Sequence, residues 1–150
     1  MNACIFHDTS AQLHDHRVFE IVEDAYNRRE KVLIFASSDE RAAEIDRFLW
    51  IIRQDSFIPH KIVHETDGSS GVSVTIVTTE WNPLQAGILI ADGHCSLEFA
   101  FGFSMIHEFV SRSSPEIQQV CRNRYRAYME AKIPVEYLKT GVWKGYAKDS

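Results

Sequence analysis

Histidine and aspartate side chains crowd the first 16 residues of the chain, and both are common ligands of zinc and non-haem iron. The cluster consists of His7, Asp8, His14, Asp15 and His16. Its spacing matches no closed metal site, and His14 and His16 point to different sides of a predicted helix start. We therefore favour a solvated loop and helix start. The alternative is a metal-assisted hydrolase that uses His7, Asp8, His14 and His16.

Sequence patterns of nucleotide-binding and nucleophilic sites are missing. The turns after the first two predicted strands, 7–10 and 37–40, contain no glycine, which dinucleotide-binding and phosphate-binding loops require. The nucleophile elbow Gly-x-Ser-x-Gly is approached only around Ser104, where the second glycine is absent. We therefore expect no cofactor of the usual nucleotide kinds. The widely spaced cysteines, Cys4, Cys95 and Cys121, indicate buried thiols in a reducing cytoplasm.

One aromatic residue of the second predicted helix lies away from the apolar stripe of that helix. The stripe consists of Ala42, Ile45, Leu49 and Ile52. Trp50 falls roughly 120° from the centre of the stripe, at about 100° per residue. The apolar segment 56–60, which contains Phe57 and Pro59, follows shortly after it. Two interpretations stay open: Trp50 anchors an interface with another protein, or it covers a neighbouring part of its own domain.

A second group of residues lies on the last predicted helix, in the run 122–126. Arg122 and Arg126 are four residues apart and share one helix face, with Tyr125 at its border. Guanidinium groups beside an aromatic ring suit a peptide that carries both a carboxylate and an apolar ring. A solvated basic face is the plainer interpretation. An acidic-peptide site and a site for single-stranded nucleic acid are the alternatives.

Alternating strands and helices position these residues. Short apolar runs predict strands at 3–6, 32–36, 57–63, 72–76 and 88–91, and in the second half of 99–110. Helical spacing predicts helices at about 11–29, 39–51 and 115–131. The last helix begins after Ser114 as N-cap, with Pro115 in its first turn. Its predicted inward residues are Ile117, Val120, Cys121, Tyr125 and Tyr128.

The order of these elements predicts one domain over residues 1–150 of the α/β class. We expect a layered α/β/α sandwich with a mixed, largely parallel sheet, Rossmann-like without a nucleotide-binding loop. Residues 66–71 read as a loop, and the tail that contains Trp143 reads as an extended, packed segment.

Composition and charge narrow the class of protein further. The chain has 150 residues, of which 45% are hydrophobic, and this is enough for a core without disulfides. No apolar run reaches the length of a membrane span, and no secretory signal is recognisable. The formal net charge is −5, with about −9 on the first 109 residues and +4 on the last 41. An acidic body with a basic end favours a small acidic partner over DNA, so we expect little or no direct DNA binding.

Taken together, these residues resemble those of the chi subunit family of bacterial DNA polymerase III. The matching pieces are 31–34, the helix from Ala42 to Trp50, the segment 55–60, and the arginine and tyrosine helix from Arg122 to Tyr128. The resemblance covers most of the chain and is weakest over about 64–100. It implies a non-catalytic accessory subunit of the clamp-loader complex in DNA replication, located in the cytoplasm at the replisome.

The resemblance also implies partners and site residues. Trp50 and Phe57 would contact the psi subunit of the clamp loader, with Pro59 shaping the loop. Arg122 and Tyr125 would bind the acidic C-terminal tail of the single-stranded-DNA-binding protein, whose last residue is Phe, and the helpers of this pair would be Arg124 and Arg126. Family members can also join a repair helicase in place of psi.

Overall fold

The computed structural model describes residues 2–52, 57–65 and 72–139. The predicted loop at 66–71 and the predicted packing of Trp143 lie outside these ranges. Seven strands are present: β1 (Ala3–Asp8), β2 (Val32–Phe35), β3 (His60–Ile62), β4 (Val74–Val77), β5 (Ile88–Ala91), β6 (Met105–Phe109) and β7 (Val135–Lys139). The helices are the 3-10 turn Ala11–Leu13, α1 (His14–Asn27), α2 (Asp39–Ile51), α3 (Leu97–Ala100) and α4 (Pro115–Glu130).

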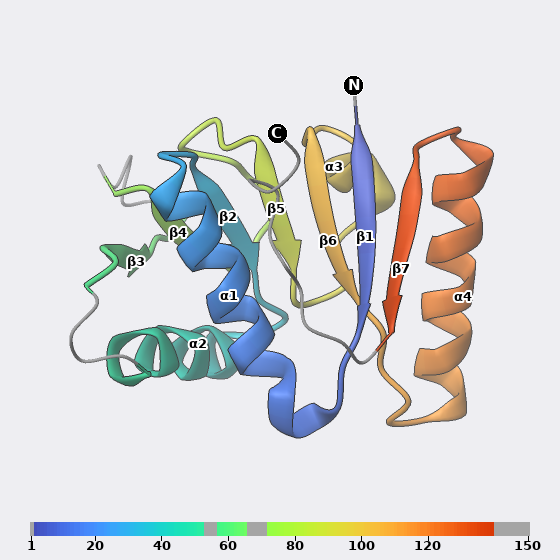
Figure 1. The fold of residues 1–150 in the computed structure, drawn as a ribbon, viewed down its shortest axis with the longest axis horizontal. Coiled ribbons are helices and arrows are strands. Elements are labelled where there is room, and N and C mark those ends of the chain that lie inside the picture. Colours follow the sequence, from blue (N-terminus) through green and yellow to red (C-terminus); the bar gives the residue numbers. More distant parts are fainter. Residues whose placement is uncertain (1, 53–56, 66–71, 140–150) are drawn as a thin grey trace.

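The strands form one seven-stranded sheet in the order β3-β4-β2-β5-β6-β1-β7 (Figure 1). All strand pairings among the described residues are parallel, so the sheet is parallel throughout and not mixed as predicted. After β2 the chain forms β3 and β4 on one side of β2, and β5 and β6 follow on the other side. The gap between the ends of β2 and β5 is thus the topological switch point, where α/β folds commonly bind ligands.

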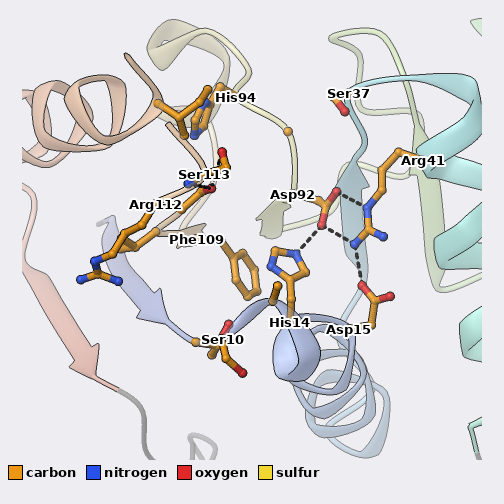
Figure 2. Close-up of a pocket in the computed structure, with 16 residues that line it drawn as sticks. Ser10, His14, Asp15, Ser37, Arg41, Asp92, His94, Phe109, Arg112 and Ser113 are labelled. Carbon is orange, nitrogen blue, oxygen red and sulfur yellow. Dashed lines mark hydrogen bonds and ion pairs between the residues drawn. The ribbon is translucent and has the colours of Figure 1, made fainter. Parts of the chain in front are cut away.

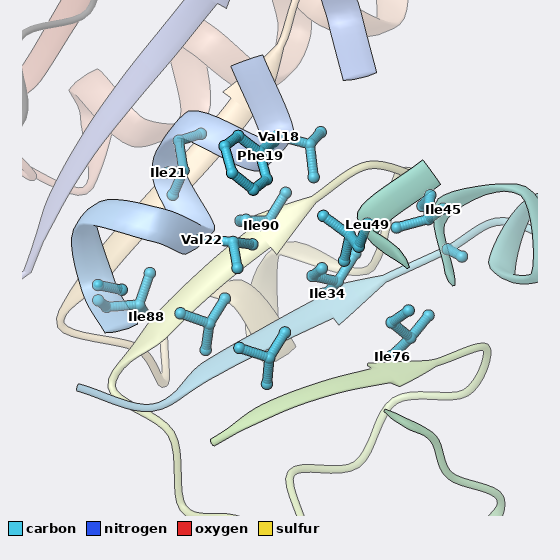
Figure 3. Packing of buried hydrophobic residues seen from close by; sticks show 14 of the residues in the cluster. Val18, Phe19, Ile21, Val22, Ile34, Ile45, Leu49, Ile76, Ile88 and Ile90 are labelled. Carbon is cyan, nitrogen blue, oxygen red and sulfur yellow. The ribbon is translucent and has the colours of Figure 1, made fainter. Parts of the chain in front are cut away.

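Helices cover both faces of the sheet. On one face α1 and α2 pack through Val18, Ile21, Val22, Ile45 and Leu49 onto the strands (Figure 3). On the other face α3 and α4 pack onto alternate residues of the same strands, among them Leu33 and Leu89. Because the inner strands are buried on both faces, they are apolar almost without interruption. This arrangement confirms the predicted α/β layered fold.

Several predicted boundaries differ from the structure. The strand expected at 57–63 is limited to His60–Ile62, and the short helix α3 was not predicted. Val120 is 36% exposed, so its predicted inward position is wrong. The inward face of α4 is set instead by Cys121, Arg124 and Tyr128, which are spaced by three and four residues. Among the described residues, no helix combines the length and the apolar character needed to cross a membrane.

Candidate protein interaction sites

The helix α4 begins with an N-cap residue followed by a proline. The Ser114 hydroxyl accepts a hydrogen bond from the Ile117 backbone N–H at 3.1 Å, and Pro115 occupies the first turn. Both features agree with the sequence prediction. The helix then runs beside β7 at one edge of the molecule (Figure 1).

A cleft of about 530 Å³ lies between α4 and the strands β1 and β7. We call it the α4–β7 cleft. The ring centroids of Phe6 and Tyr125 are 5.2 Å apart, and those of Tyr125 and Tyr137 are 6.2 Å apart. Met129 and Cys121 add to the lining. The cleft therefore has an aromatic and apolar lining and is large enough for an apolar side chain of a ligand.

Two exposed arginines, Arg122 and Arg126, line the same cleft. Neither has an ion-pair partner within the described ranges. The structure thus brings together three of the four residues predicted on this helix, namely Arg122, Tyr125 and Arg126. Their guanidinium groups are available to a carboxylate from outside the protein.

The fourth predicted residue, Arg124, lies on the opposite face of α4 and is only 7% exposed. Its Nε and Nη2 donate to the two carboxylate oxygens of Glu108 at 3.0 and 2.6 Å. Its Nη1 donates to the Cys95 carbonyl at 2.6 Å, and the Tyr128 hydroxyl donates to Glu108 at 2.7 Å. Arg124 is thus a component of a buried network and does not line the cleft.

An arginine that the sequence analysis did not single out lies at the rim of the α4–β7 cleft. Arg112 donates from both terminal nitrogens to the carboxylate of Asp8, at 2.5 and 2.8 Å. The Tyr137 hydroxyl donates to the same carboxylate at 2.6 Å. The hydrogen bond from Arg112 holds the pKa of Asp8 below its usual range. Only the assembled sheet brings these residues together, because Asp8 is about 100 positions or more from both partners.

At the opposite edge of the sheet, the end of α2 and the segment before β3 expose a group of apolar side chains. Trp50 is 44% exposed, Ile51 59% and Phe57 65%. The ring centroids of Trp50 and Phe57 are 5.2 Å apart. We call these three residues the aromatic edge. Pro59, also predicted here, is half-buried next to it.

The Trp50 ring packs on His60, a residue of the segment 56–60 to which the sequence assigned no role of its own. The Trp50 and His60 rings have centroids 4.3 Å apart. His60 is buried, and its ring nitrogens lie 2.8 Å from the Ile58 carbonyl and 3.0 Å from the Asp46 carbonyl. Trp50 therefore covers a fixed ring of its own domain and is still 44% exposed, so the structure is compatible with both interpretations left open.

A second cleft, of about 780 Å³, opens at the carboxyl ends of the strands, at the switch point (Figure 2). We call it the switch-point cleft. Several of its charged groups are paired with each other: Arg41 contacts Asp92 and Asp15, and His14 Nε2 lies 2.6 Å from Asp92. Burial raises the pKa of Asp92, but the hydrogen bonds from Arg41 and His14 outweigh burial and lower it to about 2. This network ties α1 and α2 to the end of β5.

The histidine and aspartate cluster of the first 16 residues does not converge in space. His7 and Asp8 lie buried in β1, so the predicted solvated loop is wrong for them. The ring nitrogens of His7 contact Arg17 and His107, Asp8 binds Arg112, and His14 binds Asp92. Across the described residues, no three His, Cys, Asp or Glu side chains gather as a metal site. The geometry therefore gives the hydrolase alternative no support.

The sequence is similar to those of known proteins from one family. Residues 1–136 match the family described as DNA polymerase III chi subunit, HolC. The chain is 29% identical over 128 residues to DNA polymerase III subunit chi of Escherichia coli K12. The aligned region covers 85% of this chain and 84% of that protein. It is 28% identical over 119 residues to the chi subunit of Pseudomonas aeruginosa PAO1, with coverage of 77% and 79%.

Solved structures with a similar fold have very different sequences. The C-terminal domain of Saccharomyces cerevisiae Dbp5, solved with Gle1 and IP6, superposes with a TM-score of 0.59 at 10% identity, over 95% of this chain and 93% of that one. The T4 protein UvsW gives a TM-score of 0.56 at 9% identity, over 93% of this chain and 41% of that one. At this level of identity the similarity concerns the fold alone.

Proposed function

The chain belongs to the DNA polymerase III chi subunit family and is thus an accessory subunit of DNA replication, and from this premise we propose that it bridges two protein partners. One is the acidic C-terminal tail of the single-stranded-DNA-binding protein, bound in the α4–β7 cleft. The other is the psi subunit of the clamp loader, bound at the aromatic edge. In this role the protein is a non-catalytic cytoplasmic adaptor.

One arrangement supports tail binding most directly: two arginines that have no ion-pair partner among the described residues lie beside an aromatic cleft. Arg122 and Arg126 are exposed, and Tyr125 lies between them on the same helix. A peptide that ends in Phe presents a terminal carboxylate and a ring within a few ångströms of each other. Charge-assisted hydrogen bonds to the carboxylate stabilise such a complex by about 1.5–3 kcal/mol each. After the loss of association entropy, we expect micromolar affinity.

Calorimetric titration with an acidic peptide that ends in Phe tests this function. We expect the free acid to bind, the amidated peptide to bind much more weakly, and salt to weaken the binding of the free acid. Arg122→Ala is expected to lower the affinity about tenfold or more, because it removes a charge-assisted bond. Arg47→Ala, which removes an exposed arginine of α2, is the matched control. Equal binding of the acid and the amide would refute tail binding.

The aromatic edge supports the second partner. Trp50, Ile51 and Phe57 are large apolar side chains exposed together on one surface, as at the centre of protein interfaces. Trp50 is also preorganised by the fixed His60 ring, which reduces the entropy lost on binding. A repair helicase that occupies the place of psi would use the same surface.

Co-purification with psi tests this surface. We expect Trp50→Ala to weaken the complex by about 2–4 kcal/mol, as for other aromatic hot spots. Peptide binding in the α4–β7 cleft should be unchanged in this variant. Tyr26→Ala, which shortens an exposed aromatic residue of α1, is the control. If Trp50→Ala unfolds the protein, or leaves the complex intact, the proposed surface is wrong.

We propose little direct DNA binding, because the formal net charge is −5 and the acidic first 109 residues would repel DNA. A filter-binding titration at low salt tests this point. Tight binding that falls steeply with salt would indicate direct contacts with phosphates and would contradict the adaptor role.

A further inference from the structure

Arg112 is placed differently from the arginines of α4. Together with Val110 and Ser111, it lines both the α4–β7 cleft and the switch-point cleft. Figure 2 shows its guanidinium turned away from Asp92 and His14. Its hydrogen bonds to Asp8 of β1 and its proximity to Tyr137 of β7 place it at the rim of the α4–β7 cleft.

The guanidinium of Arg112 is both fixed and accessible. Asp8, which is 3% exposed, holds two of its N–H groups, and the Tyr137 hydroxyl shares the Asp8 carboxylate. The Arg112 side chain nevertheless remains 56% exposed. A guanidinium has five N–H donors in a rigid plane, so the edge that faces Asp8 leaves the Nε–H and a further N–H for a second acceptor.

We propose that Arg112 is a specificity-determining residue of the α4–β7 cleft, where it binds an acidic side chain upstream of the peptide's C-terminal residue. This inference rests on the proposed tail binding. Arg122 holds the terminal carboxylate, and Arg112 selects peptides that carry aspartate or glutamate before it. Because the fork of Arg112 is already ordered by Asp8, binding a second carboxylate loses little side-chain entropy.

The charge of Asp8 limits the size of the effect. Its carboxylate neutralises part of the Arg112 charge, and the exposed side of the guanidinium faces solvent. We therefore expect Arg112 to contribute selectivity of roughly threefold to tenfold, smaller than the effect of Arg122 on affinity.

Two peptides and two variants distinguish a specific contact of Arg112 with the peptide from a general effect of the protein's positive charge. One peptide has aspartates upstream of a C-terminal Phe with a free carboxylate, and the other has asparagines in the same positions. For each protein, calorimetry gives the dissociation constant of the asparagine peptide divided by that of the aspartate peptide. A high value of this ratio means selectivity for the acidic peptide. We expect Arg112→Gln to lower this ratio roughly threefold or more and Arg47→Gln, which removes the same charge elsewhere, to leave it unchanged.

The ratio is insensitive to partial unfolding, because both peptides are titrated into the same preparation. If Arg112→Gln does not fold because Asp8 is left buried beside one partner, the double variant Asp8→Asn with Arg112→Gln replaces the ion pair by two amides. The same fall in the ratio is expected for it.

The outcomes distinguish this inference from the function on which it rests. A wild-type protein that does not discriminate the free acid from the amidated peptide overturns tail binding itself. A wild-type protein that discriminates them, with a ratio that Arg112→Gln leaves unchanged or that Arg47→Gln lowers equally, overturns only the role of Arg112.

Discussion

Three arginines lie within five residues of α4, and their positions on the helix give them different roles. Arg122 and Arg126 share the exposed face, four residues apart. Arg124 shares its face with Cys121 and Tyr128, which pack against the sheet. Chemically identical side chains are therefore exposed beside the α4–β7 cleft in two cases and held in a buried ion pair in the third.

Replacement of Arg124 tests this division at the residue scale. We expect Arg124→Gln to lower the free energy of unfolding by about 3–5 kcal/mol, because the Glu108 carboxylate would remain buried without its cation. Arg122→Gln should change it by less than about 0.5 kcal/mol. Urea unfolding of the two variants gives both values. Similar stabilities would show that the Arg124 and Glu108 pair contributes little.

The sequence already contained a signal for the buried arginine. Cys121 and Tyr128 were predicted to face inward, and a residue three and four positions from them shares their face. Glu108, an acidic residue within a predicted strand segment, requires a buried cation as partner. By contrast, nothing local connects Arg112 with Asp8, since they are brought together only by the parallel pairing of β1 with β6 and β7.

At the scale of elements, α4 presents the cleft and depends on its N-terminal cap. We expect Ser114→Ala to lower the free energy of unfolding by about 1 kcal/mol, because the Ile117 N–H loses its acceptor. For a domain of this size, the melting temperature should fall by about 2–4 °C. The control is Ser113→Ala, since the Ser113 hydroxyl contacts only Ser111 among the described residues. Equal melting temperatures of the two variants would contradict the cap.

Elements with strong local signals were predicted well, and the others needed tertiary information. The bounds of α2 agree with the prediction, because Ser38 caps the helix and its apolar stripe is regular. The helix α3 has only four residues, too few for a helical period to be visible. The tail residues Val135–Lys139 were expected to be extended, but their pairing with β1 could not be predicted from their own sequence.

At the scale of the whole molecule, two buried histidines make the stability depend on pH. His7 Nε2 lies 2.8 Å from His107 Nδ1, and both side chains are fully buried. Burial lowers the pKa of both imidazoles, and for His7 the neighbouring His107 lowers it further. The folded protein therefore keeps both neutral at a pH where the unfolded chain binds protons.

Stability should consequently fall as the pH drops below about 6.5, the usual pKa of histidine. Below about pH 5.5, the two histidines together remove up to ~2.7 kcal/mol per pH unit, because only the unfolded state takes up their protons. Urea unfolding between pH 7.5 and 5 measures this slope. His16→Gln, which replaces an exposed histidine, should leave the curve unchanged. A stability that stays constant down to pH 5 would show that the pair is not held neutral.

The two proposed partner surfaces lie at opposite edges of the sheet, which makes them independent. The aromatic edge packs on β3 and the α4–β7 cleft borders β7, the first and last strands of the seven-stranded order. With a strand spacing of about 4.8 Å, the two edges are separated by about 29 Å of packed sheet. At this distance, substitutions on the two surfaces should have additive effects within about 0.5 kcal/mol.

Under the proposed function, this separation predicts a ternary complex of the protein with both partners. We expect saturation with the acidic tail peptide to change the affinity for psi less than twofold, because no described contact links the two edges directly. In the double variant Trp50→Ala with Arg122→Ala, the affinities for psi and for the tail peptide should each fall by the amount found in the corresponding single variant. Calorimetry with and without peptide measures the coupling. A change of tenfold or more would mean that the sheet transmits binding from one edge to the other, and the protein would then act as a switch between its partners and not as a passive bridge.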